Sequence, residues 1–161
     1  MKVGLWGVTT EAAAVGLLRA VRHGLADVPG AVLVAAAYAD ARRMAHAPLA
    51  PELLPRVARA AEVGVCLLDT AVKDGRGLLD WLSPDELMSL VTDAHDAGQQ
   101  VALAGALRAE DLAVVRATGA DIVGVRSAAC GDGRRSGSLE AARVRALRAA
   151  CAATPPLRAS R

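Results

Sequence analysis

The stretch VGVCLLDTAVKDG, residues 63–75, decides the fold. Its first half is an almost unbroken apolar run that ends at Asp69, and its second half carries Lys73 and Asp74. An apolar run that does not alternate with polar residues is typical of a parallel strand covered on both faces. In parallel α/β folds, ligands bind beyond the carboxyl ends of the strands. We therefore expect a buried strand here, with functional groups at its carboxyl end.

The same unit, a short apolar run followed by an amphipathic helical stretch, occurs five times along the chain. The apolar runs are KVGLWG (2–7), AVLVAAAYAD (31–40), VGVCLLDT (63–70), QVALAG (100–105) and ADIVGVRS (120–127). The expected helices cover 9–27, 50–61, 84–97, 108–118 and 138–152. Ser83-Pro84-Asp85-Glu86 is a capping box, and the glycines of HDAGQQ and RATGAD mark helix ends that lead into strands. These signals predict five βα units.

Five βα units fit two architectures, a compact doubly wound sheet or part of a (β/α)₈ barrel. A complete barrel typically needs about 250 residues, whereas the chain has 161 residues and begins inside a strand. We therefore expect an α/β fold made of the C-terminal five βα units of a TIM-type barrel, over residues 1–152. Residues 153–161 are expected to form a flexible tail. We expect Met1 to be an internal start codon, and a separate chain that supplies the missing strands is the alternative.

The composition excludes several classes of function. The net charge is +2 and aromatic residues make up only 2% of the chain, which disfavours binding to nucleic acid or to a membrane surface. The longest apolar run, 31–39, is too short to span a bilayer. Three cysteines without a CxxC motif predict neither a disulfide framework nor a zinc site. We expect a cytoplasmic protein without a metal or cofactor.

Lysine is rare in this chain. Of 19 lysines and arginines, only Lys2 and Lys73 are lysine, and both lie on or just after an apolar run. Lysine can lose its proton and act as a nucleophile or base, which arginine effectively cannot do. Asp69 could then orient one amine or carry protons. The alternatives are an ion pair of Lys73 with Asp69 or Asp74, and, for Lys2, a lysine that merely follows the initiator Met.

Two glycine-containing stretches overlap the ends of the last two apolar runs and continue beyond them. They are ALAGA (102–106) and GVRSAACGDGRRSGS (124–138). The loops after the last two strands of a barrel often hold phosphate. The alternative is that these glycines form ordinary turns. The predicted phosphate- or substrate-binding residues are Asp40, Gly105, Arg126, Gly131 and Gly133.

Five motifs occur together in this order and spacing: KVGLWG, VAAAYADA, LLDTAVKDG, ALAGALRAEDL and GADIVGVRSAAC. Over nearly the whole chain, to about residue 150, they resemble the (5-formylfuran-3-yl)methyl phosphate synthase family. The resemblance implies a (β/α)₈ barrel that condenses two molecules of glyceraldehyde 3-phosphate into a furan aldehyde phosphate. It implies a lysine Schiff base, an aldol step, phosphate elimination, cyclisation and dehydration. The product leads to methanofuran-type one-carbon carriers.

Residue by residue, the resemblance makes Lys2 a proton acceptor and makes Asp69 and Lys73 the acid and lysine of a DTAxKDG motif. The Schiff-base lysine of the family lies in an Asp-x-Lys motif on the first strand, which has no counterpart here. Ala37 and Ser127 stand where glycine is expected, and Ala106 where serine is expected.

Two other functions stay open. One is a different Schiff-base aldolase that uses Lys73 as its nucleophile. The other is a half-barrel that binds phosphate or a partner chain without catalysis. An open sheet also exposes two edges, from which we expect self-association into a homo-oligomer.

Overall fold

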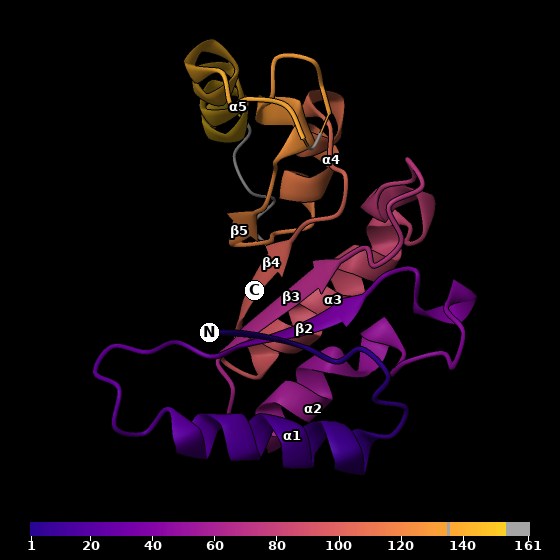
Figure 1. The fold of residues 1–161 in the computed structure, drawn as a ribbon, viewed down its shortest axis with the longest axis vertical. Coiled ribbons are helices and arrows are strands. Elements are labelled where there is room, and N and C mark those ends of the chain that lie inside the picture. The colour runs from indigo at the N-terminus through magenta and orange to yellow at the C-terminus, as the bar shows by residue number, and fades with distance from the viewer. Residues whose placement is uncertain (135, 154–161) are drawn as a thin grey trace.

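The computed structural model describes residues 1–134 and 136–153. In this part of the chain, five parallel strands pair side by side in chain order (Figure 1). They are β1 (Lys2–Gly4), β2 (Val34–Tyr38), β3 (Val65–Asp69), β4 (Gln100–Leu103) and β5 (Ile122–Val123). The helices that follow them are α1 (Glu11–Gly24), α2 (Leu54–Ala60), α3 (Pro84–Asp96), α4 (Leu112–Ala117) and α5 (Ala141–Ala153). The predicted tail lies outside the described residues, apart from Ala153 at the end of α5.

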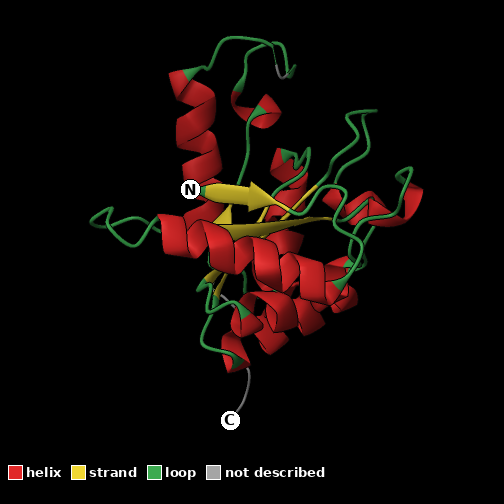
Figure 2. Cartoon of the chain, turned by 60° about the horizontal axis from the view of Figure 1, so that its bottom comes forward, coloured by secondary structure: helices red, strands yellow, loops and turns green. Residues whose placement is uncertain are grey.

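The strand order decides between the two predicted architectures. A doubly wound sheet reverses its order at a switch point, whereas here the strands run from β1 to β5 without a reversal. Each helix contacts the next one along the chain, from α1 to α5. Most of the helices lie on one side of the strands (Figure 2). The prediction of an α/β fold made of five βα units of a barrel is therefore confirmed.

The hydrophobic core lies between the sheet and the helices. Buried strand residues such as Ala35, Cys66 and Leu68 belong to one cluster with helix residues such as Leu18 and Leu87. Neighbouring side chains of a strand point to opposite faces, so the strand residues between the buried ones lie on the other face. We call this the open face; its less buried members include Lys2, Val34, Leu67, Asp69, Gln100 and Ile122.

The helix boundaries follow the local signals. Ser83 and Glu86 form the predicted capping box: Ser83 Oγ accepts from Glu86 N at 3.3 Å, and Glu86 Oε2 accepts from Ser83 N at 2.7 Å. The glycines expected to end helices, Gly98 and Gly119, have φ angles of +72° and +87°, a conformation that favours glycine. No helix in the described part of the chain is long and apolar enough to cross a membrane.

The strands are shorter than the apolar runs that predicted them. The fifth run, 120–127, forms only the two-residue strand β5. Among the described residues, this strand pairs with β4 alone, so few backbone hydrogen bonds extend it. The chain then turns at Ser127–Ala129 into a 3₁₀ helix. Arg126 therefore lies beyond β5, just before this turn.

Candidate active site

The carboxylate of Asp69 lies at the carboxyl end of β3 on the open face. It is the last residue of the strand, and Cys66 and Leu68 point into the core on the other face. The Asp69 side chain is 24% exposed. Its Oδ1 accepts a hydrogen bond from Thr70 N at 2.8 Å, which fixes the carboxylate at the start of the loop.

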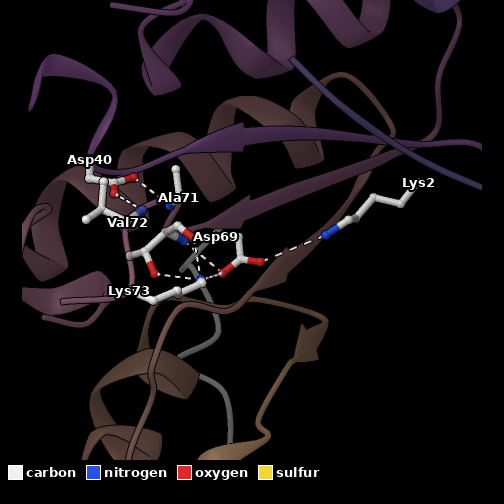
Figure 3. Close-up of polar contacts among 7 residues, drawn as sticks. Lys2, Asp40, Asp69, Ala71, Val72 and Lys73 are labelled. Atoms are coloured by element: carbon white, nitrogen blue, oxygen red, sulfur yellow. Dashed lines mark hydrogen bonds and ion pairs between the residues drawn. The ribbon is translucent and has the colours of Figure 1, made fainter. Parts of the chain in front are cut away.

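Two lysine amines approach this one carboxylate (Figure 3). Lys73 Nζ lies 3.3 Å from Asp69 Oδ1, and Lys2 Nζ lies 3.9 Å from Asp69 Oδ2. Lys2 comes from β1 and Asp69 from β3, so the second pair crosses over β2. Lys2 begins β1 and is in register with the start of β3, so its side chain reaches along the open face toward the carboxyl end of β3. The two lysines of the chain therefore share one carboxylate on the open face.

Lys73 is held by the loop from which it projects. Its Nζ donates to the carbonyl oxygen of Thr70, and to Thr70 Oγ1 at 3.1 Å. Thr70 is buried, so this anchor is fixed by packing. The Lys73 side chain is still 42% exposed, which leaves its amine open to a ligand.

Asp40 holds the loop after β3 through hydrogen bonds to the loop backbone. It is buried, with 1% of its surface exposed. Oδ1 accepts from Ala71 N at 2.8 Å and Oδ2 accepts from Val72 N at 2.7 Å (Figure 3). Both carboxylate oxygens are thus engaged by backbone amides. The structure places Asp40 as a residue that positions the loop between Asp69 and Lys73.

A cleft of about 380 Å³ opens beside Asp69 and Lys73. The loops after β3, β4 and β5 form its walls. Its lining includes Asp69, Lys73, Gly75, Arg76, Gly105, Ala106, Gly124, Arg126 and Ser127. Three of these side chains are cationic and one is anionic, so the cleft suits a ligand with negative charge.

Besides Asp40, four residues were predicted to bind phosphate or substrate, and the structure separates them into two groups. Gly105 and Arg126 line the cleft. Gly131 does not: a Cβ on it would lie 1.9 Å from Glu140 Oε1, and its carbonyl oxygen accepts from Arg143 Nη2 at 2.8 Å. Gly133 lines a neighbouring cleft of about 450 Å³.

Comparison with known proteins adds an independent observation. The model of the 4-HFC-P synthase family matches residues 1–148. The chain belongs to this family. Its sequence is 47% identical to the (5-formylfuran-3-yl)methyl phosphate synthase of Methanopyrus kandleri and 40% identical to that of Methanocaldococcus jannaschii, each over 153 residues.

These alignments cover 94% of this chain but only 64% of each relative. The chain therefore spans slightly less than two thirds of the length of these curated relatives. Among solved structures, the phosphoribosyl anthranilate isomerase of Thermus thermophilus aligns over 94% of this chain and 98% of its own. The TM-score is 0.32 and the identity 17%.

The sequence analysis missed one charged side chain that lines this cleft, that of Arg76. Asp74 Oδ2 accepts from Arg76 Nε at 2.9 Å, and the guanidinium lies 4.2 Å from the centroid of the Trp81 ring. The hydrogen bonds from Arg76 hold the pKa of Asp74 below its usual range. The signal was its place next to Gly75 in the loop that carries Lys73.

Proposed function

We propose that this chain supplies the proton-transfer and phosphate-binding groups of a (5-formylfuran-3-yl)methyl phosphate synthase. The reaction condenses two molecules of glyceraldehyde 3-phosphate. The observation that carries the proposal is the pair of amines, Lys2 and Lys73, that share the Asp69 carboxylate beside a cationic cleft. Membership of the 4-HFC-P synthase family supports it.

The two lysines and Asp69 suit a reaction with several proton transfers. A neutral amine can take a proton from a carbon next to a carbonyl, and the resulting ammonium can return it to an oxygen that leaves. Asp69 lies between the amines and stabilises whichever of them is charged. We propose that Lys2 is the proton acceptor. Lys73, anchored by Thr70, would transfer protons at the other carboxylate oxygen of Asp69.

The phosphate groups of the substrate would enter the cleft. Arg76 and Arg126 line it with guanidinium groups, which bind phosphate oxygens in a forked geometry. Gly105 lines the cleft with its backbone, and its lack of a Cβ lets the loop after β4 pack against Thr70. We assign Asp40 to loop positioning, since both of its oxygens are engaged. Gly131 and Gly133 would shape the loop before α5.

The complete reaction needs a Schiff-base lysine, and the resemblance places that lysine on a strand without a counterpart here. Within the described residues, β1 and β5 each pair on one side only. We propose that further βα units, from a longer chain or a second chain, pair with these edges and bring the missing lysine to the open face. The 64% coverage of the relatives supports this.

Product formation tests the proposal. The chain is incubated with glyceraldehyde 3-phosphate alone and together with the N-terminal third of the Methanopyrus kandleri relative. Mass spectrometry then detects (5-formylfuran-3-yl)methyl phosphate. We expect product only from the combined sample. Product from the chain alone would remove the need for further strands, and no product in either sample would contradict the proposal.

A second candidate is a Schiff-base aldolase that uses Lys73 itself. The observation that favours it is the 42% exposure of the Lys73 side chain beside the cleft. An amine there can add to an aldehyde and lose water to form an imine. Borohydride reduction with glyceraldehyde 3-phosphate would then add mass to the wild-type chain and not to Lys73→Arg. No added mass in the wild type would leave a half-barrel that binds phosphate without this chemistry.

A further inference from the structure

Tyr38, which no step above uses, lies on the same face as the two lysines. It is the last residue of β2, and it pairs in register with Asp69 of β3. Partners in a parallel ladder project to the same face, so the Tyr38 ring and the Asp69 carboxylate share the open face. Tyr38 is also the only tyrosine of the chain, which contains no phenylalanine.

Gly4 of β1 leaves the room that the Tyr38 hydroxyl occupies. A Cβ on Gly4 would lie 2.2 Å from the Tyr38 hydroxyl oxygen and 3.4 Å from Cζ. The ring therefore reaches across to β1, with its hydroxyl directly over Gly4. Trp6 packs edge-on against the ring, with centroids 5.6 Å apart and an interplanar angle of 80°. Only glycine leaves room for the phenol here.

Strand β1 also carries Lys2, on the face that the Tyr38 hydroxyl covers. Lys2 and Gly4 are two residues apart in β1 and so lie on one face. The ion pair between Lys2 and Asp69 spans from β1 to β3, and Tyr38 lies on the strand between them. The phenol, one amine and the carboxylate therefore come from three adjacent strands of one sheet.

The Tyr38 hydroxyl has no hydrogen-bond partner among residues 1–134 and 136–153. The hydroxyl is not enclosed by protein, so a ligand on the open face can reach it. Burial, and then the charges of Asp69 and Asp40, raise the pKa of Tyr38. The group is therefore a protonated donor at neutral pH, and its O–H is not engaged by another residue of the described part of the chain.

We propose that the Tyr38 hydroxyl donates a hydrogen bond to the carbonyl or hydroxyl oxygen of a sugar phosphate bound at the open face. This inference rests on the proposed function and adds a fourth catalytic residue to Lys2, Asp69 and Lys73. The hydrogen bond strengthens as the oxygen gains negative charge, which lowers the barrier to proton removal from the neighbouring carbon.

The single tyrosine provides a direct test on the 161-residue chain. Labelling with 3-fluorotyrosine gives one fluorine resonance, and glyceraldehyde 3-phosphate is titrated while calorimetry follows binding. We expect a saturable shift of the resonance. Inorganic phosphate, which has no carbonyl group, is the control and should shift it much less. Heat of binding without a shift overturns the role of Tyr38 alone, whereas neither heat nor shift overturns the proposed function as well.

Kinetics supply a second readout in whichever sample forms product. Tyr38→Phe keeps the ring and removes the hydroxyl, so kcat should fall by about 10-fold or more while KM changes little. Gly4→Ala keeps the hydroxyl but displaces it, and should lower kcat similarly. Melting temperatures of both variants check that they fold. If Gly4→Ala does not fold, the kcat of Tyr38→Phe alone tests the proposal. A wild-type kcat in Tyr38→Phe would overturn the proposal.

Discussion

Gly105 and Thr70 are in direct contact where the loops after β4 and β3 meet. A Cβ on Gly105 would lie 2.9 Å from Thr70 Cγ2 and 3.0 Å from Thr70 N. The φ angle of Gly105 is +112°, which side chains rarely adopt. Thr70 also accepts from Lys73 through its hydroxyl. The contact therefore links the wall of the cleft to the anchor of the lysine.

We predict that Gly105→Ala lowers the free energy of unfolding by about 1–3 kcal/mol, because it combines backbone strain with a clash against Thr70. Chemical denaturation measures the change. The matched control is Gly16→Ala in α1, where nothing lies within 4 Å of the added Cβ. An alanine in this exposed helical position should stabilise the chain by about 0.5–1 kcal/mol. Equal effects of the two variants would contradict the importance of the contact.

Asp40 gives a prediction about the loop that carries Lys73. Asp40→Ala removes both acceptors of the Ala71 and Val72 amides. Hydrogen exchange at these two amides should then become faster, and the unfolding free energy should fall by about 1–3 kcal/mol, because these part-buried donors lose their partners. Mass spectrometry of peptides across the loop measures the exchange.

The exposed Asp27→Asn variant is the control for Asp40→Ala. It should leave both the exchange and the stability unchanged. Unchanged exchange at Ala71 and Val72 in Asp40→Ala would show that the carboxylate does not hold the loop.

Local signals predicted those parts of the structure that depend on neighbours in sequence. The near-continuous apolar runs located all five strands, and the capping box of Ser83 placed the start of α3. The place of Asp69 at the end of β3 followed from the same pattern. Strand ends were less accurate, because the pairing partner sets how far a strand such as β5 extends.

The rest of the site depends on contacts between distant segments. Arg76 is fixed partly by stacking on Trp81, and Tyr38 is placed by the space over Gly4. Gly131 packs against Glu140, just before the last helix, so this glycine makes room for a protein side chain. No spacing rule in the sequence distinguishes such glycines from those that face a ligand, because the difference lies in what the Cβ would meet.

The ionisation of Tyr38 gives a prediction with a defined sign. Its pKa is raised by burial first and by the charges of Asp69 and Asp40 next. Asp69→Asn removes one of these charges, so the tyrosine should ionise at lower pH than in the wild type. A spectrophotometric titration reports only this residue, because the chain has one tyrosine.

The same shift affects stability in alkaline solution. The folded state holds the phenol proton more tightly than the unfolded state, so the stabilisation is full below the ordinary tyrosine pKa. It is lost as the pH rises through the pKa of the folded state. Tyr38→Phe should remove this part of the loss of stability at alkaline pH.

For the titration, a curve of Asp69→Asn identical to that of the wild type would show that the carboxylate does not act on the phenol.

The two lysines give the prediction that bears most directly on catalysis. Lys73→Arg and Lys2→Arg keep the positive charge that pairs with Asp69, but arginine cannot lose its proton in a protein. In the sample that forms the furan product, each variant should lower kcat by about 100-fold or more. Arg59→Lys, an exposed exchange on α2, is the matched control and should keep wild-type turnover. Both variants retain the charge. Product formation at the wild-type rate in one of them would therefore show that its lysine is only an ion-pair partner of Asp69.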